Sequence, residues 1–145
     1  MLPEPVELGG QSYGAKGPVA YRLEVSRTGS AHAFHLLLTA VLGGPCMRCL
    51  EPAEVRLEVD AREVHQPQLG DEELICPYVD GDELDLEAWA HDALLLDAPA
   101  QILCRVACAG LCPVCGESLN DADPEDHRHA GTEGPFAGLD DLLPT

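Results

Sequence analysis

The stretch CRVACAGLCPVCGESLN, residues 104–120, holds four of the seven cysteines of this 145-residue chain. Cys112 and Cys115 stand three apart before a glycine, and on a tight turn this spacing lets both thiolates reach one tetrahedral ion. Cys104 and Cys108 stand four apart, which places them on one face of a helical turn. The stretch therefore offers two pairs of soft ligands, each spaced for a divalent metal.

A third pair, Cys46 and Cys49, lies upstream in PCMRCLEP. Buried cysteines that act as small hydrophobic residues would explain Cys76, but not six cysteines in spaced pairs. A disulfide framework is disfavoured, because the cysteine count is odd and the first residues, MLPEPVELGG, lack the basic and apolar regions of a secretory signal. The pattern indicates a metal protein of a reducing, cytoplasmic compartment.

The charge of the chain is concentrated in its second half. The formal net charge is −18. Residues 1–62 hold six basic and seven acidic residues, whereas residues 63–145 hold two basic and 19 acidic ones. Such a surface repels nucleic acid phosphates and favours a basic protein partner; acid-rich composition that serves solubility alone is the alternative. No apolar run is long enough to span a bilayer, so we expect no membrane partner.

The hydrophobic pattern predicts an α+β fold, in which an antiparallel β-sheet is followed by one main helix and a zinc-knuckle segment. The predicted strands are 19–27, 32–42, 55–62 and 74–79. The second is expected to be buried on both faces and to end at the glycines and proline of 43–45. The predicted helix is 85–97, with Asp85 as its cap. Residues 1–17 and 63–73 are predicted to be loops.

We expect one compact unit with two parts. Residues 1–103 would hold the sheet, the helix 85–97 and the first knuckle, which is the turn that carries Cys46 and Cys49. Residues 104–145 would form the cysteine- and histidine-containing metal-binding segment and the tail. Within that tail, 121–135 is predicted to be an acidic loop and 135–143 a short closing apolar segment.

Several of these motifs together resemble one family, the YceD-like large ribosomal RNA subunit accumulation proteins. The matching parts are Cys46-Met47-Arg48-Cys49-Leu50-Glu51-Pro52, the lead-in through Asp85-Leu86, Pro99, the stretch 104–120 and Pro135-Phe136-Ala137-x-Leu139. The resemblance implies a bacterial cytoplasmic factor for accumulation of 23S rRNA and for assembly of the large ribosomal subunit. It implies no enzymatic activity. The chain departs from the family's tail pattern at Gly134-Pro135-Phe136, where the family tends to carry Asp-Pro-Arg.

A second departure concerns the metal. Where the family often has Cys-x-Cys, this chain has His127-Arg128-His129, and histidine is chemically able to replace thiolate at zinc. We predict two zinc ions, each with four ligands. The predicted sets are Cys46, Cys49, Cys104 and Cys108 for the first ion, and Cys112, Cys115, His127 and His129 for the second. The alternative is a single ribbon-type site made of the two CxxC pairs, with both histidines solvated.

The sequence favours a binding module over an enzyme. A zinc deaminase needs His-x-Glu before its PCxxC motif, and neither His32 nor His35 is followed by a glutamate two residues later. A thiol oxidoreductase needs its CxxC at a helix start. The expected partners are a pre-50S particle, a 23S rRNA precursor or a basic large-subunit ribosomal protein, with Arg48, Arg56 and Arg62 as candidate RNA contacts. The alternative is a generic zinc-binding adaptor for a basic protein.

Overall fold

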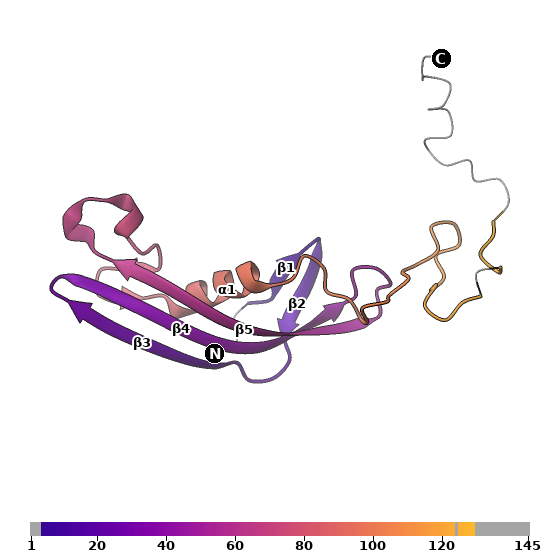
Figure 1. The fold of residues 1–145 in the computed structure, drawn as a ribbon, viewed down its shortest axis with the longest axis horizontal. Coiled ribbons are helices and arrows are strands. Elements are labelled where there is room, and N and C mark those ends of the chain that lie inside the picture. Colours follow the sequence, from indigo (N-terminus) through magenta and orange to yellow (C-terminus); the bar gives the residue numbers. More distant parts are fainter. Residues whose placement is uncertain (1–3, 124, 130–145) are drawn as a thin grey trace, which may run out of the picture.

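The computed structural model describes residues 4–123 and 125–129 (Figure 1). It is mostly an antiparallel β-sheet with one α-helix, followed by the segment that carries the later cysteines. The predicted apolar segment 135–143 lies outside the described residues. No helix in the described part is both long enough and apolar enough to cross a bilayer.

The sheet is built around one long central strand. Its members in the described chain are β1 (Val6–Leu8), β2 (Gln11–Ala15), β3 (Ala20–Thr28), β4 (Ala31–Pro45) and β5 (Pro52–His65). Along one edge β4 pairs with β5, and along the other it pairs with β3 and then β2. The strands predicted over 19–27, 32–42 and 55–62 are confirmed, although two of them are longer than predicted.

Side chains of β4 alternate between a buried face and a half-exposed face. Phe34, Leu36, Leu38 and Leu42 are buried, while residues between them such as Leu37 are only partly covered. The prediction of burial on both faces was therefore wrong. A central strand of an antiparallel sheet needs only one apolar face, because the other face can remain in water.

β4 also continues through Gly43 and Gly44 to Pro45, where the sequence predicted a break. The reason is the neighbouring strand. A Cβ on Gly44 would lie 2.6 Å from the ring of Tyr13, so glycine here lets that ring lie against the backbone. Tyr13 is fully buried, and its hydroxyl donates to the carbonyl of Pro45 at 2.8 Å.

The N-terminal segment is a hairpin and not the predicted loop. β1 and β2 pair in the register Val6↔Tyr13, joined by Gly9 and Gly10, which both have positive φ. Val6 is 1% exposed and belongs to the core. The hairpin is short, and its burial against the rest of the core supplies the stability that its own length does not.

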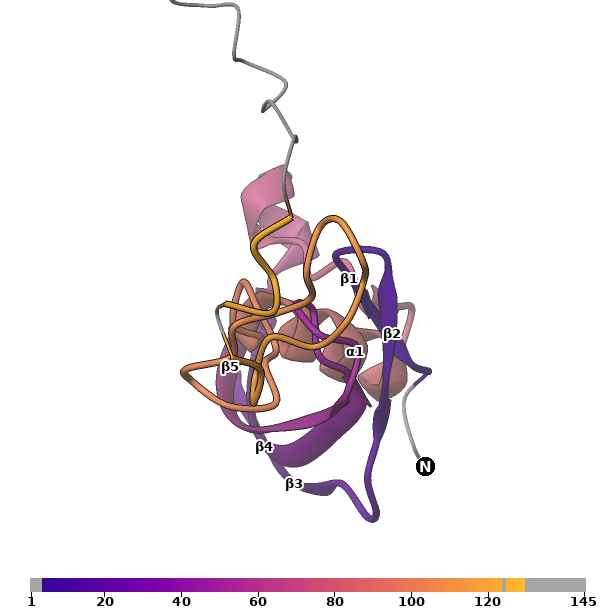
Figure 2. The same cartoon turned by 90° about the vertical axis from the view of Figure 1, so that its right-hand side faces the viewer.

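The helix α1 (Leu86–Asp97) closes the core, and here the prediction is confirmed. Asp85 caps it by accepting a hydrogen bond from the backbone N–H of Ala88 at 2.9 Å. Trp89 and Leu94 are buried, and α1 contacts β5 and β1. Figure 2 shows the helix lying within the concave side of the curved sheet. That placement leaves the β3 side of the same face less covered.

The strand predicted over 74–79 is not formed. Two short 3₁₀ helices, Pro67–Leu69 and Glu72–Leu74, lead into a turn, and only Val79–Asp80 (β6) is extended, paired with Glu83–Leu84 (β7). The competing influences are local: Pro77 has no N–H for a strand ladder, and Asp71 caps the second 3₁₀ helix.

Candidate metal centres

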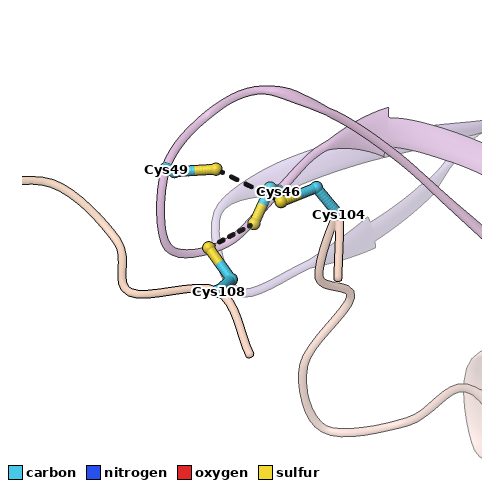
Figure 3. A group of neighbouring side chains, drawn as sticks. All are labelled: Cys46, Cys49, Cys104 and Cys108. Atoms are coloured by element: carbon cyan, nitrogen blue, oxygen red, sulfur yellow. Dashed lines mark hydrogen bonds between the residues drawn. The ribbon is translucent and has the colours of Figure 1, made fainter. Parts of the chain in front are cut away.

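The first candidate centre joins the end of the sheet to the segment after α1. Cys46 follows β4, Cys49 lies in the loop before β5, and Cys104 and Cys108 come from the later segment (Figure 3). Their four sulfurs lie within 4.8 Å of one another. The Sγ atoms of Cys46 and Cys108 are 3.7 Å apart, and those of Cys49 and Cys104 are 3.5 Å apart. Zinc–sulfur bonds of about 2.3 Å in a tetrahedron would set these edges at about 3.8 Å.

All seven cysteines are free thiols, and the sulfur separations in the first centre far exceed a disulfide bond. Cys46, Cys49 and Cys108 are 0%, 5% and 3% exposed and form part of the hydrophobic core. Four thiols gathered in this way, three of them buried, match a closed, four-coordinate metal site. Such a site leaves no position open for a substrate.

The second candidate centre is local and more exposed. Cys112, Cys115, His127 and His129 also place one ligand atom each within 4.8 Å of the others. Cys112 Sγ is 3.2 Å from His129 Nε2, and Cys115 Sγ is 3.5 Å from His127 Nδ1. A tetrahedral ion with zinc–sulfur and zinc–nitrogen bonds of about 2.3 and 2.05 Å would need about 3.5 Å. The structure thus brings together the same two groups that the sequence predicted; ligation itself stays a prediction.

The two CxxC pairs lie in separate backbone turns of the same conformation. In the first, the N–H of Leu50 donates to the carbonyl of Cys46 at 3.0 Å, and the N–H of Cys46 donates to Glu51 at 2.7 Å. In the second, Gly116 donates to Cys112 at 2.9 Å, and Cys112 donates to Glu117 at 2.8 Å. The fifth residue of each turn has positive φ, 64° at Leu50 and 75° at Gly116.

Leu50 is the single non-glycine residue with positive φ in the described chain, so the first turn is held in a conformation that leucine disfavours. A backbone kept in this state by its surroundings is typical of a functional loop. In each knuckle the turn brings its two thiols together. The sites differ in the second pair of ligands, which is Cys104 and Cys108 at the first knuckle and His127 and His129 at the second.

The Cys104–Cys108 segment is a turn and not the expected turn of helix. The N–H of Cys108 donates to the carbonyl of Arg105 at 3.0 Å, and no helix is assigned to these residues. Both thiols still face the first knuckle, because Cys104 meets Cys49 and Cys108 meets Cys46. Residues four apart share a face in a single turn as they do in a helix, which is why the grouping was predicted despite the wrong backbone.

Each cluster contains one thiol that ionises readily. Burial opposes ionisation of Cys46, but nearby N–H groups, led by that of Arg48, lower the pKa of Cys46 to about 6. The backbone N–H of Cys115 leads the groups that lower the pKa of Cys112 to about 6. Desolvation, with hydrogen bonds from neighbouring thiols, raises the pKa of Cys104 to about 12. A bound cation would supply the positive charge that ionisation of such thiols requires.

Arg48 takes a role that the sequence did not predict. Its guanidinium donates to the carbonyl of Cys108 at 3.1 Å and to Oε1 of Gln101 at 3.1 Å. It thereby ties the first knuckle to the segment that brings the other two thiols. An arginine between two cysteines was the available signal, but its partner lies 60 residues away in the chain. Gln101 had no signal in the sequence.

The other arginines named as candidate RNA contacts are also paired. Arg56 lies 3.1 Å from Glu58, and Arg62 lies 3.4 Å from Asp60, each on the exposed face of β5. Cys76 is buried and outside both clusters, as expected for a cysteine without a spaced partner.

Comparison with known proteins places the chain in a family. A family model described as Large ribosomal RNA subunit accumulation protein YceD matches residues 34–143. Uncharacterized proteins of Mycobacterium tuberculosis and Mycobacterium bovis are each 34% identical over 106 residues, covering 69% of this chain and 50% of the relative. An uncharacterized protein of Mycobacterium leprae is 30% identical over 112 residues, covering 73% of this chain and 50% of its own length.

The chain therefore spans about half the length of the curated relatives it matches. No solved structure matches it. The family match covers well over half of the chain and includes both CxxC pairs and the segment between them. The chain belongs to the YceD family of large ribosomal RNA subunit accumulation proteins.

Proposed function

We propose that this chain is a non-enzymatic, zinc-bound factor of the bacterial cytoplasm that supports accumulation of 23S rRNA and assembly of the large ribosomal subunit. The observation that carries the proposal is the family match over residues 34–143. The two four-residue clusters support the metal, because thiolate and imidazole are the ligands of structural zinc.

Two zinc ions per chain agree best with the geometry. The single-site alternative requires the two CxxC pairs to share one ion, whereas each pair lies in a different cluster. Elemental analysis of the chain purified without a histidine tag should give two zinc ions. One zinc ion, with Cys104 and Cys108 open to alkylating reagents, would instead support the single-site alternative.

The metal at the first centre would cross-link two distant parts of the fold. It would join the end of β4 to a segment 62 residues later in the chain, beyond α1. On this proposal residues 1–103 and 104–145 form one unit through that centre. The second centre would order a polar segment that has few buried apolar residues of its own.

A basic protein is the favoured direct partner within the pre-50S particle. Residues 63–145 hold two basic and 19 acidic residues, and both bases are engaged: Arg105 lies 3.2 Å from Asp121 and Arg128 lies 2.8 Å from Glu125. Contact with phosphate requires free cations, and this half of the chain offers none among its described residues. A ribosomal protein rich in lysine and arginine would meet a complementary field.

The test is deletion of the gene in its own bacterium, followed by complementation. We expect the deletion to lower 23S rRNA relative to 16S rRNA and to accumulate precursor particles, and the wild-type chain to restore both. We expect the chain to co-sediment with pre-50S particles in a gradient. Normal 23S levels in the deletion strain, with the chain bound to a basic protein outside ribosomal fractions, would support the generic adaptor instead.

A further inference from the structure

One edge of the sheet is left open along the whole of β3. Within the described residues β3 pairs with β4 only, in the register that runs from Ala20↔Thr39 to Thr28↔Ala31. Figure 1 shows β3 along the outside of the sheet, on the side away from β5. An unpaired strand presents a row of free N–H and C=O groups to any other strand of suitable register.

The hairpin geometry decides which residues of β3 present those groups. Thr28 and Ala31 flank a two-residue turn that begins at Gly29, with φ +62°, so they form a hydrogen-bonded pair. Hydrogen-bonded pairs then recur at every second residue, and the even-numbered residues of β3 bond to β4. The hydrogen bond from Lys16 N to Val41 O agrees, since it uses an odd-numbered residue of β4 on this same side.

The odd-numbered residues of β3 therefore direct their backbone groups outward. They include Tyr21, Leu23 and Val25, whose side chains lie on the same face as the core. Tyr21 is 60% exposed and Val25 is 56% exposed, because α1 covers the β5 side of this face. The open edge thus combines free backbone groups with exposed apolar side chains.

The charged residues of β3 are complementary to a second copy in one register. In an antiparallel pair related by a twofold axis, residues equally distant from a central residue face each other. With Leu23 at the centre, Arg22 of each copy faces Glu24 of the other, and Tyr21 faces Val25. With Glu24 or Arg22 at the centre, like charges would face each other, and with Val25 at the centre neither charge meets an opposite one.

This register also satisfies the backbone. Leu23, Tyr21 and Val25 all direct their N–H and C=O groups outward, so the pairs they form are hydrogen-bonded pairs. Arg22 and Glu24 then fall at the non-hydrogen-bonded positions, where opposing Cα atoms are about 4.5 Å apart and side chains are closest. Backbone geometry allows this register, and the facing charges distinguish it from the neighbouring registers.

The distribution of charge permits two copies to meet here. Residues 1–62, which include β3, hold six basic and seven acidic residues, whereas the acidic second half would repel its copy. The other open edge, β5, is less suitable. This strand carries six charged side chains, which disfavour pairing with another strand: Glu54, Arg56, Glu58, Asp60, Arg62 and Glu63.

We propose that two copies of this chain associate through their β3 strands, antiparallel and centred on Leu23, to form one continuous sheet. The inference does not depend on the ribosomal role proposed above. The test is the mass of the purified, metal-loaded full chain, measured by sedimentation equilibrium over a range of concentrations. The wild-type chain should approach twice its mass of 15.5 kDa as concentration rises.

Charge reversal identifies the interface. Arg22→Glu alone or Glu24→Arg alone should weaken the dimer by about tenfold or more, because two facing ion pairs become two repulsive pairs. The double variant should dimerise like the wild type. An equimolar mixture of the two single variants should form a heterodimer, since each then offers the charges the other lacks. That rescue also shows that neither single variant has simply unfolded.

Arg56→Glu is the matched control: Arg56 pairs with Glu58 along β5, at the opposite edge of the sheet, as Arg22 pairs with Glu24 along β3 within one chain. It should leave the dimer unchanged. A wild-type chain that stays monomeric at every concentration overturns the proposal and leaves the β3 edge to a strand of another protein. A dimer that survives both single reversals also overturns it, because the interface then lies elsewhere.

Discussion

Replacing Cys49 by serine should release the metal of the first centre and weaken the whole fold. The thiol of Cys49 is 5% exposed, lies 3.5 Å from that of Cys104 and is surrounded by core residues. Serine is a poor zinc ligand, and the three remaining thiols would leave an open position in a site built to be closed. Binding free energy at such a site contributes directly to folding, so its loss appears as lost stability.

The size of the effect follows from the length of chain that the metal closes. Cys46 and Cys108 are 62 residues apart. Treated as a cross-link, a loop of this length lowers the entropy of the unfolded chain by an amount worth about 4 kcal/mol. For a domain of this size, the loss of that amount lowers the melting temperature by roughly 12 °C.

The assay is thermal or urea unfolding followed by circular dichroism, with zinc measured on the same samples. Cys115→Ser is the matched control, because Cys115 occupies the equivalent place in the second knuckle. Its centre joins Cys112 to His129, which lie outside the core on which the sheet depends. Each variant should lose one zinc ion, but Cys115→Ser should leave the unfolding midpoint of the sheet nearly unchanged.

Two results would refute this reasoning. A Cys49→Ser chain with full zinc content and an unchanged midpoint would mean that Cys49 is not a ligand of a structural metal. Equal losses of stability in both variants would mean that the two centres belong to one cooperative unit, and that a position outside the core does not limit the effect of the second centre.

Three further predictions concern single side chains. Arg48→Ala should weaken zinc retention against a chelator by roughly tenfold while Arg105→Ala does not, because Arg48 holds the two halves of the first centre together and Arg105 makes only an exposed ion pair. Tyr13→Phe should cost about 1 kcal/mol in urea unfolding, since it leaves the partly buried carbonyl of Pro45 without its donor. Tyr78→Phe should cost about 1 kcal/mol at pH 7, through the lost hydrogen bond to Asp92. Desolvation raises the pKa of Tyr78 to about 12 in the folded chain, above the unfolded value of 10.0, so this difference should shrink as pH rises from about 10 towards 12 in parallel unfolding curves.

The central part of the fold was predictable because local pattern and tertiary burial agree there. Alternation along β5 and the capped apolar stripe of α1 each correspond to one exposed and one buried face. The N-terminal hairpin was missed because its strands are short and its stability comes from burying Tyr13 and Val6 against other elements. A signal was present: two glycines at 9–10 lie between short alternating segments, as hairpins require.

For the candidate centres, too, part of the arrangement could be predicted from the sequence and part could not. Ligand spacing was sufficient to pair Cys46 with Cys49 and Cys104 with Cys108, but it left open whether Cys46 and Cys49 meet that pair or Cys112 and Cys115. It could not show that Arg48 would hydrogen-bond to a distant part of the chain, since that role depends on where the segment after α1 passes. Arg48 was interpreted as a nucleic acid contact because it is a cation in the first CxxC loop, in the more basic half of the chain; its two hydrogen bonds give it a structural role as well.

The two knuckles differ in burial because of the segments on either side of them and not because of their own turns. The first connects β4 to β5, so the sheet carries its cysteines into the core; the second is flanked by the isolated bridge Leu111↔Ser118, and Cys115 is exposed. The same turn is therefore buried at the end of the sheet in the first knuckle and accessible in the second.

Around the second centre, Arg105 and Arg128 are already paired with carboxylates, so the remaining acids there stay uncompensated. A zinc ion with two thiolates and two neutral imidazoles adds no net charge. The second centre would thus hold an acidic surface in a fixed shape, which is what recognition of a basic partner requires.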